Sequence, residues 1–378
     1  MRVVHVVTRS QRRGAEVAAI ELADELDALG HDNELHAIAL AFDGGAVDLL
    51  PALVPTTRLD ARAVALGAWR LRRLLSRTPA DVVVAHGFRA AFTAAVATPR
   101  TSVRVWQRIS GFSIERWGRA RRTGLRCVAR RFDAVVALTP ALEVEIRKLG
   151  YAGPVWTIPN ARRPGRFTGA DREAAAATLR MSTGVGTDIP LVGFVGHLVD
   201  EKDPMVAVDV AAEVRGRGVP MHLVIAGDGP LRAQLEQHIA GRSLSDAVTL
   251  LGHRDDPEMV YAGVGLTLIT SRAEGMPGVA IEAHMAECPV VSFSVGSVAD
   301  VVLDGITGFV VPGHDASAMA DRVVALLRDP ERRREMGAAA ARRGASFDAA
   351  TTSATYATRF TDLLAARGPA ARSTARWR

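Results

Sequence analysis

The sequence predicts an α/β protein with two Rossmann-like, doubly wound domains, each built on a parallel sheet. Two observations carry this prediction. Short valine-rich runs, such as 3–7 and 82–84, have the composition of strands that are buried on both faces. Amphipathic helical segments alternate with such runs about six times in each half of the chain, as βαβ units require. Two such domains facing each other form a cleft, which is the usual place for a small-molecule site.

In the first half, the valine run at 3–7 begins the alternation and a helix follows it. The segment 15–29 places Val17, Ile20 and Leu22 on one side, and Gly30 ends it. We expect further strands at 34–41, 81–85, 103–109, 133–138 and 155–158, and further helices at 69–76, 116–131 and 140–149. Residues 1–170 are therefore the predicted N-terminal domain, and 171–188 are a predicted linker region with a short helical patch at 172–179.

The second half repeats the alternation, and it forms the predicted C-terminal domain, 189–350. Strands are expected at 190–195, 222–226, 248–251, 266–270, 289–293 and 309–311, and helices at 205–215, 231–239, 279–286, 298–303, 316–327 and 330–343. A last helix at 353–366 belongs to the segment 351–378, which we expect to pack back on the N-terminal domain and to end in a basic tail.

Composition limits the class of protein. The chain has 378 residues, of which 48% are hydrophobic and 23% charged, an ordinary globular profile with room for two domains. The apolar runs are shorter than the ~18 residues that span a bilayer, and the start is too quickly polar for a signal peptide. Cys127 and Cys288 lie far apart and form no metal-ligand pattern. We therefore expect a cytoplasmic protein with reduced cysteines.

Positive charge is concentrated in the first half. Residues 1–170 contain 26 Lys and Arg against 15 Asp and Glu, and seven of the arginines fall within 116–131. This segment has the pattern of a basic amphipathic helix, which favours an anionic membrane surface and a peripheral location; the simpler alternative is a solvated helix face. Nucleic acid is disfavoured, because neither aromatic platforms nor a groove-binding motif accompanies the charge.

The segment 265–292 is the most informative part of the chain. An apolar strand, a glycine-containing turn and a helix follow one another there, which places a helix N-terminus at the carboxyl end of a parallel sheet. Such a position suits a phosphate or a polar ligand. Glu274 in the turn and Glu282 on the helix are suited to accept hydrogen bonds from sugar and ribose hydroxyls. The alternative is that Glu274 caps the helix and Glu282 is a solvated helix residue.

Two further positions in the first half belong to ligand-binding places of an open α/β sheet. His86 stands at the carboxyl end of the strand at 81–85, directly before a glycine. Arg13 and Gly14 lie between the first strand and its helix, again at a helix N-terminus.

With these residues in hand, the chain resembles the retaining glycosyltransferases of family 4, which have the GT-B fold. The resemblance runs from Met1 to about Ala366 and is most specific in the second half. Its motifs are EGMPGVAIE at 274–282, which fits an E-x7-E signature, VGHLVDEK at 195–202, GDGP at 227–230, PVV at 289–291, GITGF at 305–309, RGAE at 13–16, AH at 85–86 and IPN at 158–160.

The resemblance implies a nucleotide-diphosphate sugar as donor and a hydroxyl group as acceptor. The 1–170 domain would bind the acceptor and the 189–350 domain the donor. Lys202 would neutralise the diphosphate, Glu282 would accept from the ribose, and Glu274 would hold the sugar. The implied catalytic residues are His86, Glu274 and Lys202, and the implied acceptor-binding residues are Arg13 and His86. The implied donor-binding residues are Gly14, His197, Lys202, Gly229, Arg254, Glu274, Gly275, Met276, Pro277, Gly278 and Glu282. Neither a cofactor nor a catalytic metal is implied.

Two departures from the family pattern leave alternatives open. His197 stands where the family usually has arginine, and Arg13 replaces the first glycine of a GGAE loop. A neutral histidine lacks the permanent two-pronged charge of a guanidinium, so a binding-only or weakened homologue is one alternative. Another GT-B enzyme that acts on sugar phosphates is a second. The acceptor could belong to the cell envelope, to a polysaccharide or to a secondary metabolite, and the sequence specifies neither the sugar nor the nucleotide base.

Overall fold

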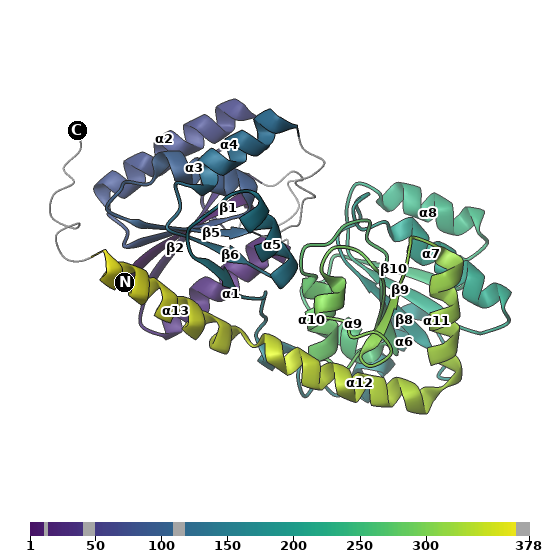
Figure 1. Ribbon diagram of the computed structural model, residues 1–378. Coiled ribbons are helices and arrows are strands. Elements are labelled where there is room, and N and C mark those ends of the chain that lie inside the picture. Colours follow the sequence, from purple (N-terminus) through teal and green to yellow (C-terminus); the bar gives the residue numbers. More distant parts are fainter. Residues whose placement is uncertain (11–13, 41–49, 109–117, 368–378) are drawn as a thin grey trace. The chain divides into compact units, whose positions relative to one another are not determined.

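The computed structural model describes the chain except for residues 11–13, 41–49, 109–117 and 368–378 (Figure 1). The chain divides into two compact units. The first unit comprises Met1–Ala161 with Ala349–Arg378, and the second comprises Arg162–Asp348. Each unit is an α/β domain around one parallel sheet, as the sequence predicts.

The first unit has a seven-stranded sheet with the order β3-β2-β1-β4-β5-β6-β7, and all the pairings described in it are parallel. The strands are β1 (Arg2–Ser10), β2 (Asp32–Leu40), β3 (Ala52–Val54), β4 (Val82–His86), β5 (Val103–Arg108), β6 (Ala134–Ala137) and β7 (Val155–Thr157). Helices α2 (Ala61–Arg77), α3 (Phe88–Ala97) and α4 (Arg119–Ala129) cover one face, while α1 (Gly14–Ala28) and α13 (Ala349–Ala366) cover the other (Figure 1). Helix α5 (Pro140–Lys148) connects β6 to β7.

The core of the first unit follows from its strand composition. The valines of β1 and β4 are fully buried, as expected for central strands that have helices on both faces. The α13 residues Tyr356 and Phe360 pack into this core from the C-terminal end of the chain. The structure thus places the last helix with the N-terminal sheet.

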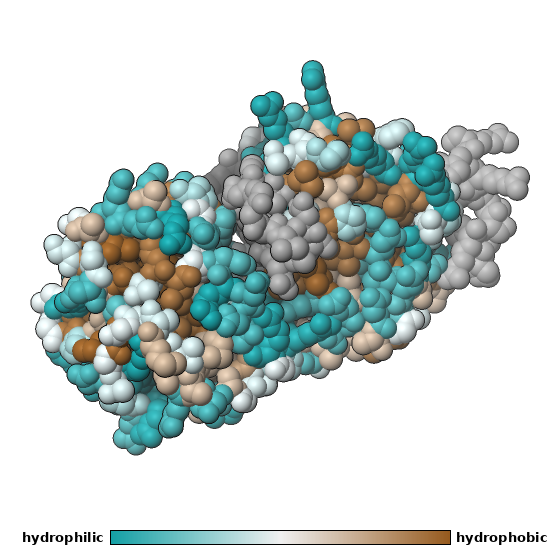
Figure 2. Space-filling view, turned by 180° about the vertical axis from the view of Figure 1, so that it is seen from behind, coloured by the Kyte–Doolittle hydropathy of each residue, from teal (hydrophilic) through white to brown (hydrophobic). Residues whose placement is uncertain are grey.

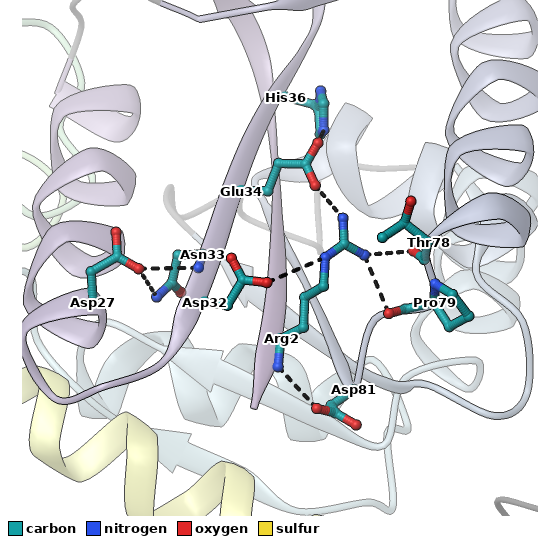
Figure 3. A network of polar contacts seen from close by, with 9 residues as sticks. All are labelled: Arg2, Asp27, Asp32, Asn33, Glu34, His36, Thr78, Pro79 and Asp81. Atoms are coloured by element: carbon teal, nitrogen blue, oxygen red, sulfur yellow. Dashed lines mark hydrogen bonds and ion pairs between the residues drawn. The ribbon is translucent and has the colours of Figure 1, made fainter.

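A polar network fastens the start of β1 to its neighbours (Figure 3). The guanidinium of Arg2 donates to Glu34 on β2 and to the carbonyl of Thr78, the latter at 2.5 Å. The backbone N–H of Arg2 donates to Asp81 at 2.9 Å. In the same region, Asn33 Nδ2 donates to Asp27 Oδ1 at 2.8 Å, which fixes the orientation of the Asn33 amide. This orientation is used below to assign the hydrogen bonds of His5.

The second unit has a six-stranded parallel sheet with the order β10-β9-β8-β11-β12-β13. The strands are β8 (Leu191–Val195), β9 (His222–Ala226), β10 (Val248–Gly252), β11 (Leu266–Ile269), β12 (Val290–Phe293) and β13 (Gly308–Val311). The helices are α6 (Arg172–Thr183), α7 (Pro204–Gly216), α8 (Arg232–Gly241), α9 (Pro257–Gly263), α10 (Gly278–Met285), α11 (Ala316–Arg328) and α12 (Pro330–Gly344). In this order β8 and β11 are adjacent although they are far apart in sequence, so the loops that follow them meet at one edge of the sheet.

The structure divides the chain at other points than the sequence analysis expected. The segment 171–188 is largely the helix α6, which belongs to the second unit and contacts α9. Arg172 on this helix donates to the carbonyls of Ala286 and Val264, at 2.5 and 3.1 Å. The chain passes between the units at 161–162 and again at 348–349. The short helical patch expected at 172–179 extends to Thr183, and its buried residues are Ala175 and Leu179, so the segment packs as a helix of the second unit.

Other differences are local. The structure adds the short strand β3 and the helices α3 and α9, and α2 extends further toward the N-terminus than 69–76. The expected helix at 298–303 is only a 3-10 turn, Val298–Asp300. Among the described residues, none of the helices is long and apolar enough to cross a membrane.

Candidate functional site

The two loops that follow β8 and β11 are tied together at the carboxyl edge of the second sheet. Thr270, directly after β11, donates through its hydroxyl to the carbonyls of Lys202 and Asp203, at 3.0 and 2.9 Å. The backbone N–H of Arg272 donates to the carbonyl of Glu201 at 2.8 Å. These bonds hold the segments 196–203 and 270–278 in one fixed arrangement.

Lys202 and Glu274, predicted from motifs 72 residues apart, meet in this arrangement. Lys202 Nζ lies 2.5 Å from Glu274 Oε1, and Ser271 Oγ donates to the same oxygen at 2.6 Å. The side chain of Glu274 is 9% exposed and that of Lys202 is 27% exposed. Because both donors contact Oε1, the second carboxylate oxygen keeps its acceptor capacity among the described residues. The pair therefore presents an ammonium group and a fixed carboxylate oxygen side by side.

Glycines let other backbone segments press against these two loops. A Cβ atom on Gly296 would lie 1.7 Å from the carbonyl oxygen of Glu274, and the N–H of Ser297 donates to the Gly275 carbonyl at 3.1 Å. A Cβ atom on Gly229 would lie 2.5 Å from the carbonyl oxygen of Leu198. Gly229, predicted to bind the donor, thus supports the loop that carries His197 and Lys202.

Glu282 is fixed from two sides within the second unit. Arg162 Nε donates to Glu282 Oε1 at 2.6 Å, and the hydroxyl of Tyr261 donates to Glu282 Oε2 at 2.9 Å. Arg162 is 2% exposed, whereas the side chain of Glu282 keeps 15% exposure. Burial and the adjacent Glu282 carboxylate raise the pKa of Tyr261 well above its usual value, so its hydroxyl remains a neutral donor. Glu282 is therefore an oriented hydrogen-bond acceptor and not the solvated helix residue of the alternative interpretation.

The other residues predicted for the donor follow β8, β10 and β11. Gly275, Met276 and Pro277 lead from Glu274 into α10, whose first residue is Gly278, and Met276 is buried. His197 is half-buried in the loop after β8. Arg254, after β10, forms a two-pronged contact with Asp256, at 2.9 and 2.7 Å. Arg254 thus orients the start of α9 in this structure, and a contact with the donor stays a prediction.

In the first unit, His86 lies at the end of β4, as predicted, but within a buried chain of hydrogen bonds. His86 Nε2 lies 3.0 Å from His5 Nδ1 on β1, and His86 Nδ1 contacts the side-chain amide of Gln107 on β5. That amide reaches the hydroxyl of Tyr356 on α13 at 3.1 Å, and His5 Nε2 lies 3.1 Å from Asn33 Oδ1. His86 is 1% exposed and His5 is 0% exposed.

The direction of the protons along this chain follows from its fixed end. Asn33 gives its N–H₂ to Asp27, so its oxygen must accept from His5 Nε2–H. A neutral His5 then accepts at Nδ1 from His86 Nε2–H, and His86 Nδ1 accepts from the N–H₂ of Gln107, which requires exchange of the amide oxygen and nitrogen of that residue. Burial lowers the pKa of His5 to about 4 and that of His86 to about 3, so both rings are neutral at pH 7. In this arrangement His86 is a positioned, uncharged group, and its contact with the donor sugar stays a prediction.

Gly14 is the first residue of α1, and no heavy atom of the described residues lies within 4 Å of the place where its Cβ would stand. Arg13 lies outside the described residues. Sequence reasoning missed Arg162, Tyr261, Ser271 and His5. The burial of Arg162 against α10 is a tertiary contact that no local sequence pattern indicates. Ser271 could have been suspected, because it lies three residues before Glu274.

Family models place the chain among glycosyltransferases. Residues 177–343 match the model described as glycosyl transferases group 1, and residues 13–161 match the model of a glycosyl transferase 4-like domain. The two models divide the chain almost as the two units do, and the first contains Lys202, Glu274 and Glu282. The chain is therefore of the glycosyltransferase family 4 type, with the GT-B fold.

Curated relatives carry glycosyltransferase names. The chain is 40% identical over 179 residues to alpha-D-kanosaminyltransferase of Streptomyces kanamyceticus, which covers 47% of this chain and 46% of the relative. It is 29% identical over 283 residues to 2-deoxystreptamine glucosyltransferase of the same organism, covering 74% and 69%. It is 34% identical over 205 residues to D-inositol 3-phosphate glycosyltransferase of Nocardia farcinica, covering 52% and 44%. The first and third matches thus take in less than half of the relative.

Solved structures support the fold over nearly the whole chain. Sucrose-phosphate synthase of Thermosynechococcus elongatus has a TM-score of 0.81 at 18% identity, covering 97% of this chain and 99% of that one. Anabaena HepE in complex with UDP-glucose has a TM-score of 0.80 at 19% identity, covering 96% and 100%.

Proposed function

We propose that this chain is a retaining, metal-independent glycosyltransferase that moves a sugar from a nucleoside-diphosphate sugar to a hydroxyl acceptor. The observation that carries the proposal is the contact between Lys202 and Glu274 at the carboxyl edge of the second sheet. An ammonium group suits the donor diphosphate, and the adjacent carboxylate suits sugar hydroxyls. The names of the relatives and the UDP-glucose bound to HepE support the same class of donor.

The proposed reaction needs little covalent chemistry from the protein. The bond between the anomeric carbon and the diphosphate oxygen breaks on the same face on which the acceptor oxygen forms its new bond. The acceptor proton passes to the departing phosphate oxygen. Lys202 stabilises the negative charge that develops on the leaving group, and Glu274 holds the sugar, so catalysis consists mainly of positioning and electrostatic stabilisation.

A thermal-shift panel of UDP-, GDP-, ADP- and TDP-sugars tests the donor, because a ligand that binds the native state raises the apparent melting temperature. We expect one nucleotide to stabilise the protein in buffer with EDTA as well as with Mg²⁺, and we expect Lys202→Met to lose most of that shift. Arg215, which pairs with Asp246 on the surface at 3.0 Å, supplies the control Arg215→Met. No stabilisation by any of the four classes contradicts the proposal.

The stereochemical part needs its own experiment. Slow hydrolysis of an α-linked donor in the absence of acceptor, followed by proton NMR before mutarotation, shows which anomer is released first. Release of the α-sugar supports retention, and release of the β-sugar contradicts it.

The names of two relatives suggest an acceptor to try first. Both 2-deoxystreptamine and D-inositol 3-phosphate are hydroxylated six-membered carbocycles. We propose a cyclitol hydroxyl as the acceptor, which agrees with a role in secondary metabolism. Transfer to 2-deoxystreptamine or to inositol phosphates, detected by mass spectrometry of the product, tests this choice, and a polysaccharide or envelope glycan remains the competing acceptor.

A binding-only homologue is the second candidate, and His197 in the Lys202 loop is the observation that favours it. If the protein binds a nucleotide sugar but neither hydrolyses nor transfers it, and if His197→Arg does not restore turnover, the binding-only function is the better conclusion. Turnover by the unmodified chain eliminates it.

We also propose that the first unit touches an anionic membrane surface through α2, α3 and α4. Helix α3 contacts both of the others, and the three helices carry ten arginines and neither aspartate nor glutamate. Hydrophobic residues reach the surface of both units among hydrophilic ones (Figure 2). On these helices the exposed ones are Leu66, Trp69, Phe92 and Val96, and Arg73 lies over the Trp69 ring at 5.6 Å. Apolar anchors among arginines are typical of interfacial helices.

Co-sedimentation with phosphatidylglycerol vesicles tests the membrane proposal. The predicted segment 116–131 starts among residues outside those described, but α4 contains Arg119, Arg122 and Arg126. Neutralising these three should abolish binding to anionic vesicles. Binding that is unchanged by the substitutions, or that is equal on neutral phosphatidylcholine vesicles, contradicts the proposal.

A further inference from the structure

Arg162 is a buried cation that the proposed reaction does not use. It stands directly after the segment that leaves the first unit, and its backbone is fixed in the second, where its N–H donates to the carbonyl of Phe347 at 2.9 Å. A buried guanidinium is costly unless its charge is compensated. Glu282 supplies a compensating carboxylate at 2.6 Å.

The path of this side chain depends on the start of α10. A Cβ atom on Gly278, the first residue of that helix, would lie 1.9 Å from Arg162 Nη2. The guanidinium therefore passes directly over the helix N-terminus, through space that only a glycine leaves free. A cation is disfavoured beside the positive end of a helix, so the position of Arg162 serves the carboxylate of Glu282 rather than the helix itself.

The acceptor capacity of Glu282 shows what this arrangement can do. A carboxylate has about four lone-pair directions, two on each oxygen. Arg162 uses one on Oε1 and Tyr261 uses one on Oε2. Among the residues that the structure describes, one direction remains on each oxygen, and the side chain of Glu282 keeps 15% exposure toward solvent. Two neighbouring acceptor positions on a fixed plane match the two hydroxyls of a vicinal diol.

We propose that Arg162 and Tyr261 are positioning residues that aim Glu282 at the ribose 2′,3′-diol of the nucleotide, and that they thereby make the site select ribonucleotides over 2′-deoxyribonucleotides. This inference rests on the proposed function, since it requires a nucleotide donor. It goes further, because it assigns the preference of the site for ribose over 2′-deoxyribose to two residues that act through Glu282.

Isothermal titration calorimetry with UDP, ADP and GDP, each paired with its 2′-deoxy analogue, tests the inference. For the base that binds, we expect the wild-type chain to prefer the ribonucleotide by ~10-fold or more, as a hydrogen bond to a charged group implies. In Arg162→Met and in Tyr261→Phe the ratio should fall to ~2-fold, mainly through weaker binding of the ribonucleotide. Arg162→Lys, which keeps the charge but loses the Nε geometry, should give an intermediate ratio.

The ratio separates positioning from a merely structural role. A variant that only loosens the fold weakens both nucleotides equally and leaves the ratio unchanged, which overturns the inference. Tyr261→Phe keeps the ring that packs 6.2 Å from Phe167, so it serves as the milder variant if Arg162→Met does not fold. Arg166→Met is the matched control, because Arg166 pairs with Glu258 at 3.0 Å and should leave the ratio unchanged.

The two proposals also fail separately. A wild-type chain that binds a nucleotide without distinguishing ribose from deoxyribose overturns the role of Arg162 and Tyr261 and leaves the proposed function standing. A chain that binds none of the nucleotides or nucleotide sugars overturns both.

Discussion

The buried His5–His86 pair should make the stability of the first unit depend on pH. Both rings are neutral in the folded chain, because burial lowers the pKa of His5 to about 4 and that of His86 to about 3. Histidines in the unfolded chain have a pKa of ~6.5. Between these values the unfolded state binds protons that the folded state does not bind. The free energy of unfolding is therefore highest above pH ~6.5 and decreases as the pH falls toward 4.

The size of the effect follows from the two pKa differences. Each proton bound only by the unfolded chain changes the free energy of unfolding by ~1.4 kcal/mol per pH unit. Compared with a pH well above 6.5, each histidine should lower the free energy of unfolding at pH 5 by about 2 kcal/mol, and the two together by about 4 kcal/mol. That is a large part of the ~5–15 kcal/mol that stabilises an ordinary domain.

The sequence offers a probe for this unit alone. All five tryptophans fall within Met1–Ala161 and Ala349–Arg378, so tryptophan fluorescence during urea denaturation reports on the first unit. We would measure the urea midpoint between pH 5 and 8 for the wild type and for the double variant His5→Gln/His86→Gln. The variant removes both titrating groups and keeps an amide that can form hydrogen bonds, so its midpoint should change less between pH 7 and 5.

The test compares two curves of urea midpoint against pH, one for the wild type and one for the double variant. Carboxylates and the other histidines titrate in both proteins, so only the difference between the curves belongs to the pair. Curves that stay parallel from pH 8 to 5 would show that His5 and His86 are not buried as neutral groups, and the single variant His86→Gln repeats the test if the double variant does not fold.

Three further predictions concern the proposed site. Gly296→Ala should weaken nucleotide-sugar binding by ~10-fold or more in the thermal-shift assay, because its Cβ would meet the Glu274 carbonyl at 1.7 Å; Gly313→Ala shares a positive φ but has open space, so equal losses in both would contradict the steric argument. Gly14→Ala should leave the melting temperature within about 2 °C, because none of the described residues comes within 4 Å of its Cβ position, and a selective loss of turnover would place a ligand there. Lys202→Met should lower transfer activity by ~100-fold or more, measured as nucleotide release, and activity near the wild-type level would remove Lys202 from the mechanism.

Sequence patterns predicted the strands of both sheets well, because parallel strands buried on two faces are continuous valine-rich runs. The runs at 3–7 and 82–84 lie within β1 and β4, and the run at 266–270 covers β11. The units divide at 161–162 and 348–349 rather than around 171–188. The helical patch expected at 172–179 is part of α6, which packs on α9 in the second unit, and the local sequence does not show that tertiary contact.

The candidate site was predictable where a short motif brings its own geometry. Glu274, Gly278 and Glu282 lie in one loop and helix, so their spacing fixed their arrangement in advance. The partner of Glu282 was not predictable, because Arg162 is 120 residues away and its role depends on space left by a missing Cβ. Likewise, no local pattern shows that His86 faces His5, since that contact arises from the strand order of the first sheet.

The contact between Lys202 and Glu274 should affect the affinities of the chain for free UDP and for UDP-glucose. The Glu274 carboxylate lies 2.5 Å from the Lys202 ammonium and offsets its charge, so a free nucleoside diphosphate must compete with Glu274 for Lys202. Glu274→Gln removes this competition and should increase the affinity for free UDP by a few-fold at low salt, with a smaller gain at high salt because the effect is electrostatic. The same variant should lose the additional affinity that the sugar of UDP-glucose provides, because an amide is a weaker acceptor than a carboxylate. Ser271→Ala keeps the charge of Glu274 and should leave UDP affinity unchanged. If Glu274→Gln instead binds free UDP more weakly than the wild type, Glu274 contacts the nucleotide itself and the proposed separation between Lys202 for phosphate and Glu274 for sugar is wrong.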